Sequence, residues 1–162
     1  MVAYAGKIKF LGYGFYKGRK GFSLRVHAKS KAKMEARVRE LTSRRTVNDY
    51  EKWKVDLKRY VVGWVNYYKL ADMGAYLQSI DEWMRRRIRM LFWKKWKRVR
   101  TRWRNLLKLG TSNRNAGILA NSRKGYWRIA SSPILQTAPS NQRLERAGLQ
   151  FFYSYYRKSA AA

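Results

Sequence analysis

The chain has 162 residues, of which 38 are Lys or Arg and 9 are Asp or Glu, so its formal net charge is +29. Hydrophobic residues make up 46% of the sequence and aromatic residues 15%, which excludes a disordered basic tail and leaves enough apolar chain for one domain, or one domain with a small appendage. A folded domain with this charge repels itself unless a polyanion neutralises it, and nucleic acid is the obvious polyanion.

The first 27 residues have the pattern of β structure. Polar and apolar residues alternate in Lys7–Leu11 and again in Phe22–Val26, and the glycines of Tyr16–Gly21 between them are typical of a turn. This pattern predicts a two-stranded hairpin. Because an isolated hairpin is only marginally stable in water, we expect it to lean on a sheet or on a helical body.

Helices are predicted from Ser30 onwards. The first reaches about Arg44, with apolar residues on one side at Met34, Val38 and Leu41. A capping-box pattern at Thr46–Asp49 predicts the start of the second helix. Its apolar and aromatic residues recur every three or four positions and should form the core: Val47, Tyr50, Trp53, Leu57, Tyr60, Trp64, Tyr67 and Ala71.

Two glycines, one within this second helix and one after it, have expected structural roles. Gly63, in its middle, is expected to mark close helix packing rather than a ligand site. Gly74 is expected to end the helix as a left-handed cap.

The next apolar pattern runs from Leu77 to Leu106 and is predicted to stop at Gly110. An unbroken helix of this length would extend about 50 Å, which is long for a small domain. We therefore expect a bend or break near Val99–Thr101, with Thr101 capping the second segment.

The last third of the chain is divided into shorter pieces. Short helices are predicted from Asn113 to Ala120, over Tyr126–Ile129, and from Asn141 to the glycine at Gly148. Leu149–Tyr156 is strongly aromatic, and its pattern fits a helix or a strand.

The basic residues concentrate in the second half. From Trp83 onwards there are 20 basic residues and one acidic residue, and half of the 24 residues in Arg85–Lys108 are Lys or Arg with no acid among them. We expect the interleaved tryptophans, Trp93, Trp96 and Trp103, to lie in the core. A solvated charged face is the alternative for the cations, but no nearby acid balances them, and the planar guanidinium of Arg suits phosphate contacts.

No catalytic or metal-binding constellation is visible. The chain has no Cys and a single histidine, His27, and it has no phosphate-binding glycine loop. The adjacent acids Asp81 and Glu82 are expected to balance local Arg charge rather than bind magnesium. The longest apolar stretch, Tyr60–Tyr68, is too short to span a bilayer, and Met1–Leu11 lacks the apolar region of a secretory signal. We expect no membrane partner and a bacterial cytoplasmic location, with an organelle as the alternative.

Several separated motifs, in order, resemble one family. Phe10–Phe15 followed by Val26–Ser30 is similar to the last palm hairpin of group II intron reverse transcriptases. The later motifs resemble the thumb or maturase-specific domain of those proteins: Gly63–Tyr68, Trp83–Arg89, Trp93–Lys97, Asn105–Gly110 and Lys124–Arg128. The similarity extends from about Lys7 to Tyr156.

The resemblance implies a mainly α fold, in which an N-terminal β-hairpin is followed by an α-helical thumb/maturase bundle. It divides the chain into a terminal palm hairpin at 1–29, a thumb-like bundle at 30–110 and the C-terminal part of the maturase domain at 111–158. It implies that the hairpin lies on the primer side, through Phe10, Leu11, Gly12 and Tyr13.

The basic pattern and the resemblance together predict which residues contact nucleic acid. These are Arg85, Arg86, Arg87, Arg89, Lys94, Lys95, Lys97, Arg98, Arg100, Arg102, Arg104, Lys124 and Arg128. The expected partner is structured RNA of a group II intron, with an RNA–DNA duplex as a further partner.

The sequence departs from the family at the polymerase site. The aspartates that would hold two magnesium ions are missing, so no cofactor is expected in this chain and magnesium would belong to the missing palm. Two functions stay open: an RNA-binding maturase module that aids splicing and retrohoming, or a subunit that completes a split RNA-directed DNA polymerase. The latter would dock on a fingers–palm chain, or on a second copy of itself, through the hairpin. A general basic binder of the ribosomal type is the third alternative.

Overall fold

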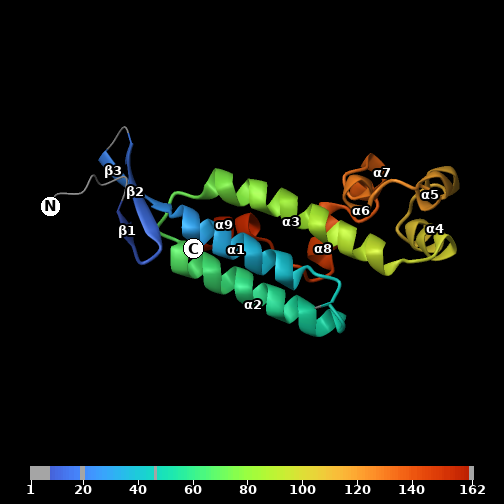
Figure 1. Cartoon of the computed structure of the whole chain (residues 1–162), viewed down its shortest axis with the longest axis horizontal. Coiled ribbons are helices and arrows are strands. Elements are labelled where there is room, and N and C mark those ends of the chain that lie inside the picture. Colours follow the sequence, from blue (N-terminus) through green and yellow to red (C-terminus); the bar gives the residue numbers. More distant parts are fainter. Residues whose placement is uncertain (1–7, 19–20, 46, 161–162) are drawn as a thin grey trace.

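The computed structural model describes residues 8–18, 21–45 and 47–160. The fold is mainly α, as predicted, with a small antiparallel sheet at its N-terminal end (Figure 1). In chain order its elements are β1 (Lys9–Phe10), β2 (Tyr13–Gly18), β3 (Gly21–Val26), α1 (Ala28–Leu41), α2 (Tyr50–Tyr68), α3 (Gly74–Lys95), α4 (Val99–Lys108), α5 (Asn113–Ala120), α6 (Tyr126–Ile129), α7 (Pro133–Thr137), α8 (Asn141–Arg146) and α9 (Phe152–Ala160).

The sheet has three strands in the order β1-β2-β3, whereas the sequence pattern predicted two. Tyr16–Gly18, predicted as part of a turn, instead belongs to the central strand, where Lys17 pairs with Phe22. The chain reverses between Gly18 and Gly21, within the predicted turn, and also earlier, at Leu11 and Gly12, whose φ angles are 49° and 85° and which connect β1 to β2. A glycine adopts this left-handed conformation without steric cost.

The sheet leans on the helical body, as expected. The Tyr13 ring lies 5.2 Å from that of Tyr68 in α2, and Val26 at the end of β3 is buried in the main core. The backbone N–H of Asp72 donates to the carbonyl of Leu24, and the Tyr16 hydroxyl donates to the Asp72 carboxylate at 3.0 Å. The strands therefore share one hydrophobic core with the helices.

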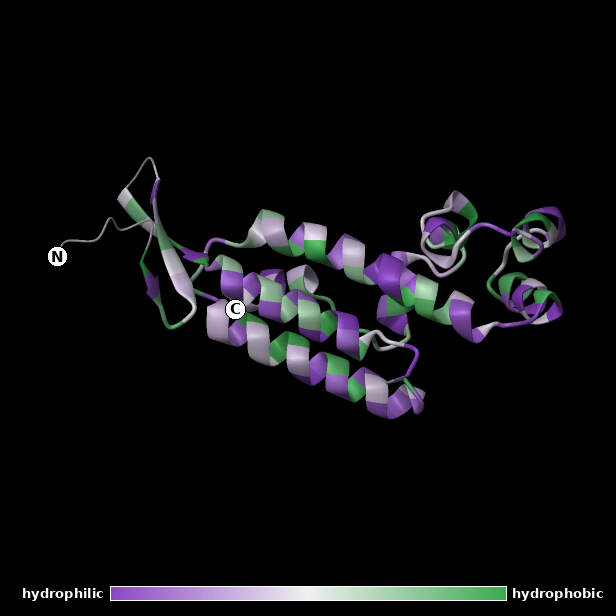
Figure 2. Cartoon of the chain, in the orientation of Figure 1, coloured by the Kyte–Doolittle hydropathy of each residue, from purple (hydrophilic) through white to green (hydrophobic). Residues whose placement is uncertain are grey.

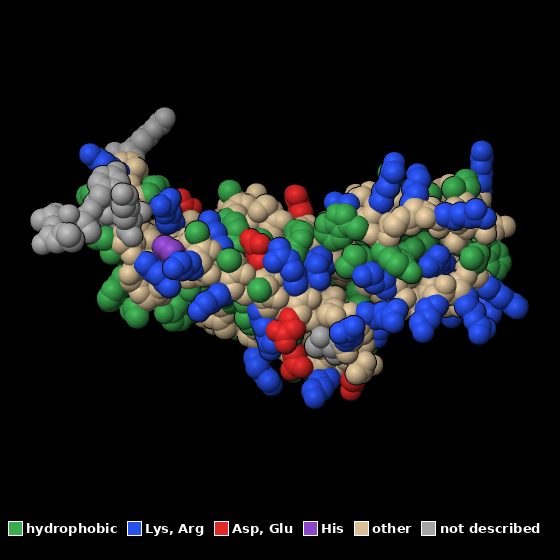
Figure 3. All heavy atoms as spheres, in the orientation of Figure 1, with side chains coloured by type: hydrophobic (Ala, Val, Ile, Leu, Met, Phe, Trp, Pro, Cys, Tyr) green, Lys and Arg blue, Asp and Glu red, His purple; other side chains and the backbone are tan. Residues whose placement is uncertain are grey.

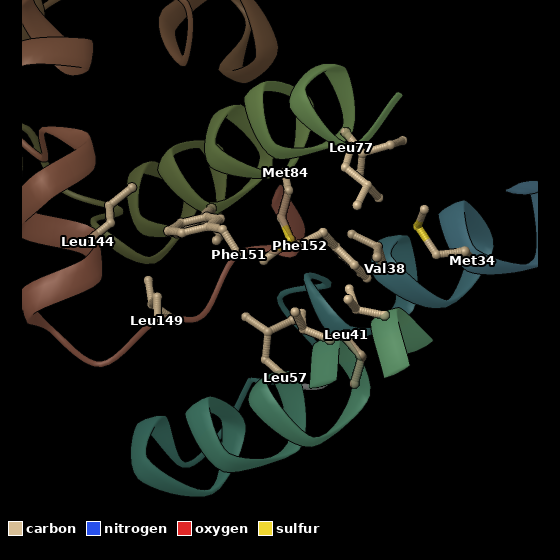
Figure 4. Packing of buried hydrophobic residues seen from close by; sticks show 14 of the residues in the cluster. Met34, Val38, Leu41, Leu57, Leu77, Met84, Leu144, Leu149, Phe151 and Phe152 are labelled. Carbon is tan, nitrogen blue, oxygen red and sulfur yellow. The ribbon is translucent and has the colours of Figure 1, made fainter. Parts of the chain in front are cut away.

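The main core lies between α1, α2, α3 and α9, with residues of α8 closing one end (Figure 4). The predicted side of α1 is buried there: Met34 and Val38 are fully covered, and Leu41 is 5% exposed. Both hydrophilic and hydrophobic residues occur along α1, α2 and α3 (Figure 2), and the buried residues of α1 and α2 are three or four positions apart, as on one face of an amphipathic helix.

Helix α2 differs in detail from its prediction. Its N-cap is Asp49, whose carboxylate accepts the N–H groups of Glu51 and Lys52, while the predicted cap Thr46 lies outside the described residues. The buried positions are Trp53, Leu57, Val61, Val65 and Tyr68. The face is thus rotated: of the residues predicted for the core, Trp64 is half-buried and Tyr67 is 54% exposed.

The roles predicted for Gly63 and Gly74 are wrong. A Cβ atom at Gly63 would meet nothing within 4 Å, so no close helix packing depends on this glycine. Gly74 is the first residue of α3 and does not cap α2, which ends at Tyr68.

The long basic helix is broken, as predicted, though slightly earlier. Helix α3 ends at Lys95 and α4 begins at Val99. Thr101 lies within α4 and is not its cap; that position is held by Arg98 without a side-chain hydrogen bond. The break lets α4 fold back on α5 and form a second core.

This second core is separate from the first and lies at the other end of the molecule from the sheet (Figure 1). Trp93, predicted for the core, is 1% exposed there, and Trp96 and Trp103 pack against it half-buried. Its buried members are Trp93, Leu106, Ala116, Leu119, Ile129, Leu135 and Ala138. Helices α8 and α9 then return to the main core. The domain boundaries expected at residues 29 and 110 stay a prediction.

The short C-terminal helices begin at serine caps. The hydroxyls of Ser112, Ser132 and Ser140 accept backbone N–H groups at the starts of α5, α7 and α8. Helix α7 was not among the short helices predicted above; it begins at Pro133, a residue that is favoured at the first position of a helix. The aromatic segment at 149–156 forms helix from Phe152. Over the described residues, none of the helices combines the length and hydropathy that crossing a bilayer would need.

Candidate nucleic-acid interface

Positive charge gathers at the end of the molecule that holds the second core. In the face shown in Figure 3, Lys and Arg side chains stand out from this end, while the acidic side chains lie over the rest. The four ion pairs found among the described residues all lie within α1 and α2, between residues 35 and 59. The cations from α3 onwards therefore have no ion-pair partner in the described part of the chain.

The predicted contact residues divide into two groups by their surroundings. In the first group, Arg89 and Arg87 of α3 bind the protein itself. Arg89 is 7% exposed and donates to the carbonyl of Pro139 and, at 2.8 Å, to the side chain of Asn141. Arg87 donates to the hydroxyl of Thr42 at 2.8 Å. Burial lowers the pKa of both guanidinium groups, with a smaller effect from neighbouring Arg residues.

The remaining members of this group lie against aromatic rings or carbonyls. The guanidinium of Arg86 lies 3.9 Å from the centre of the Trp127 ring, and that of Arg102 lies 4.7 Å from the Trp93 ring. Arg85 faces the ring of Phe151 and Lys94 that of Tyr126, while Lys95 donates to the carbonyl of Val47. These contacts hold α3 against α4 and α6 and against the residues just before α2 and α9.

The second group is exposed. Its members project from the α3–α4 connection, from α4, and from the segment around α6: Lys97, Arg98, Arg100, Arg104, Lys124 and Arg128. Three further exposed cations, Lys108, Arg114 and Arg123, lie on the same part of the chain and were not singled out from the sequence. Contact between the thirteen predicted residues and nucleic acid remains a prediction.

Two basic grooves lie beside this group. The first has a volume of about 450 Å³ and is lined by Arg39, Arg44, Arg45, Arg87, Lys94 and Tyr126 among others. The second has a volume of about 640 Å³ and is lined by Arg102, Arg123, Lys124 and, again, Tyr126. Among the residues that the structure describes, no acid lines either groove.

Sequence reasoning missed Arg39, Arg44, Arg45 and Tyr126. The adjacent pair Arg44–Arg45, directly before α2, was a visible signal. Its proximity to α3 was not visible, because it depends on how α1 packs.

The predicted primer-side hairpin lies at the end of the molecule opposite α4, α5 and α6 (Figure 1). Phe10 and Leu11 are 63% and 65% exposed. Gly12 and Tyr13 face the helices instead: the Gly12 carbonyl accepts a hydrogen bond from the Ser30 hydroxyl at 3.0 Å, and the Tyr13 hydroxyl donates to the carbonyl of Tyr67. The two predicted sites therefore occupy opposite ends of the chain's fold.

Asp81 has a structural role that the sequence did not reveal. It is 2% exposed, and its two carboxylate oxygens accept the backbone N–H groups of Phe152 and Tyr153, each at 2.9 Å. Asp81 interacts with the charge of Arg85, as expected of an acid that balances local Arg charge, but its two oxygens also cap α9, which was not predicted. Burial raises the pKa of Asp81 to about 6, although the two N–H groups and Arg85 act in the opposite direction.

Comparison with known protein families gives a match over the central helices. Residues 31–110, which extend from α1 to the residue after α4's C-cap, match the family model of the group II intron, maturase-specific domain. No curated protein sequence matches the chain. The match indicates a maturase-related function in group II intron splicing and implies interaction with intron RNA. Residues 31–110, which are 80 of the 162 residues, are therefore similar to a group II intron maturase-specific domain.

Proposed function

We propose that this chain binds structured group II intron RNA directly and thereby aids splicing and retrohoming. The observation that carries the proposal is the exposed group of cations on the α3–α4 connection, α4 and the α6 segment, which has no ion-pair partner among the described residues. The phosphates of a nucleic-acid backbone supply the negative charge that these cations do not find within the described part of the protein. The release of condensed counterions then drives the association.

The contacts that fix α3 and α4 in place support this proposal. Arg87 and Arg89 hold α3 to α1 and to the start of α8 through hydrogen bonds. Trp103 in α4 donates to the side chain of Asn113 in α5 at 2.9 Å. Since these contacts fix the elements that carry the exposed cations, the cations form a surface of defined shape. Such a surface suits folded RNA, which proteins recognise largely by shape and by phosphate and sugar contacts.

The test is a titration of the folded chain with structured intron RNA at several salt concentrations. The proposal expects an affinity that falls steeply with salt, and that depends on Lys97, Arg98, Arg100 and Arg104. Affinity that does not depend on these residues would contradict it.

A second candidate function rests on a different observation, at the other end of the molecule. Four apolar residues of the sheet and of the loop after α2 are strongly exposed: Phe10 at 63%, Leu11 at 65%, Phe22 at 69% and Leu70 at 70%. Exposed apolar side chains beside a sheet edge favour association with another chain. We infer that this end docks on a fingers–palm chain or on a second copy, so that the chain completes a polymerase that holds an RNA–DNA duplex.

A further inference from the structure

The two basic grooves meet at one aromatic residue. Tyr126, the first residue of α6, is 47% exposed and lines both grooves. The ammonium group of Lys94 lies 5.5 Å from the centre of its ring. Cations therefore flank the ring from the first groove, through Lys94, and from the second, through Arg123 and Lys124.

The charge of the two grooves is poorly balanced from within the protein. Of the cations in the first groove, Arg39 pairs with Glu35 at 3.4 Å and Arg87 donates to Thr42, but Arg44 and Arg45 are exposed and make no ion pair among the described residues. The larger groove between α3 and the α6–α8 segment, about 810 Å³, has the carboxylate of Glu82 in its lining. The two grooves that meet at Tyr126 are thus better suited to an anionic ligand.

The size and the aromatic ring indicate which form of RNA fits. Volumes of about 450 and 640 Å³ lie in the range of small-ligand pockets, which is the scale of a few nucleotides rather than of a double helix. Proteins that hold single strands combine a positively charged groove along the backbone with aromatic side chains on which bases stack. Inside a double helix both faces of a base are stacked on its neighbours, whereas an unstacked base of a single-stranded segment has a free face for this contact.

We propose that the two grooves hold an unpaired segment of RNA, with its phosphates along Arg44, Arg45, Arg123 and Lys124 and one base stacked on Tyr126. This inference rests on the proposed RNA-binding function and specifies the part of the RNA that this surface takes. The exposed cations of α4 bind the surrounding folded RNA, and the grooves bind a strand that leaves it.

The test compares two probes on the full chain: a short single-stranded oligouridine RNA, and an RNA hairpin with a fully paired stem. Tyr126→Ala removes the stacking surface and should weaken oligouridine binding by about tenfold, while hairpin binding changes less than about twofold. Tyr126→Phe keeps the ring and should bind as the unchanged protein does. Phe22→Ala, which removes an exposed ring from the other end of the molecule, serves as the matched control and should have no effect.

A second variant tests the phosphate contacts. Arg123→Gln with Lys124→Gln should weaken oligouridine binding and make it less dependent on salt. If Tyr126→Ala weakens binding of both probes equally, or of neither, while the hairpin still binds, this inference is overturned and the proposed function stands. If the unchanged chain binds neither probe, the proposed function fails as well. Thermal unfolding of each variant checks that the fold is intact. We expect it to be, because the substituted side chains are exposed.

Discussion

One carboxylate oxygen of Asp81, in α3, accepts a hydrogen bond of 2.9 Å from the backbone N–H of Phe152, the first residue of α9. The other oxygen accepts the N–H of Tyr153. The first N–H groups of a helix have no partner within the helix. Asp81, which precedes Phe152 by 71 positions in the sequence, therefore caps α9. This pair of bonds ties the end of the chain to the maturase-specific domain at residues 31–110.

Replacement of Asp81 by Ala should therefore destabilise the whole fold. It leaves two N–H groups at a buried helix end without an acceptor, at a cost of about 2–4 kcal/mol in the free energy of unfolding. Urea unfolding followed by circular dichroism measures this. The matched control is Glu82→Ala, which removes the neighbouring exposed carboxylate. Equal stability of the two variants would show that the cap contributes nothing beyond charge.

The ionisation of Asp81 should make stability depend on pH in an unusual direction. Its pKa is about 6 in the folded chain, against an ordinary value of 3.8. Between these values the folded state keeps a proton that the unfolded state has lost. The stabilising contribution is therefore fully present below the ordinary pKa and is lost as the pH rises through about 6.

The measurement compares the unchanged protein with Asp81→Asn from about pH 4 to about pH 7. The difference between their free energies of unfolding should fall as the pH rises, by at most about 1.4 kcal/mol per pH unit. A constant difference would show that folding leaves the pKa of this carboxyl group at its ordinary value, and a difference that grows with pH would show that folding lowers it.

Two glycines should respond oppositely to substitution by Ala. Gly63 lies in the middle of α2 with open space around it, so Gly63→Ala should raise the free energy of unfolding by about 1 kcal/mol through helix propensity. Gly12 has a φ angle of 85°, and a Cβ there would overlap the Tyr68 hydroxyl, so Gly12→Ala should lower stability. Denaturant midpoints decide both. A loss of stability in Gly63→Ala would mean that the site packs against something else.

The number and type of the helices could be predicted largely from apolar spacing, and the break between α3 and α4 from the length of the pattern. The face of α2 could not, because aromatic residues lie on both sides of its apolar stripe. From the sequence alone, Trp64 and Tyr67 were as good candidates for the buried face as Val61 and Val65. Packing of Phe152 beside Trp64, at 5.7 Å between ring centres, comes from a segment far along the chain.

The candidate interface was predictable as a basic stretch but not residue by residue. Composition shows that Arg89 and Arg100 carry the same charge. Only the fold shows that Arg89 is buried against Pro139 and Asn141 while Arg100 is exposed. Long-range partners of this kind leave no local pattern, and neither does the approach of Arg44 to α3.

The exposed apolar end should control association. Phe10→Ser with Phe22→Ser should lower self-association, or binding to a fingers–palm chain, because both side chains lie outside the core and are more than 60% exposed. These substitutions are preferable to deletion of the sheet, since Tyr13 and Val26 belong to the main core. Light scattering measures the oligomeric state, with Val55→Ser on α2, 54% exposed, as the control. An oligomeric state and palm binding that do not change would rule out docking through this end.

The most direct test of the account is the salt dependence of RNA binding when the four exposed cations Lys97, Arg98, Arg100 and Arg104 are changed to Gln together. If they neutralise phosphates, the affinity for structured intron RNA should fall. The slope of log affinity against log salt should become less steep by up to about 3 to 4, with no loss of stability. The control carries the same change of charge at exposed lysines elsewhere: Lys33, Lys52, Lys58 and Lys69. A smaller effect in this control is expected. Equal effects of the two quadruple variants on affinity and slope would contradict the account, because binding would then follow net charge and not this surface.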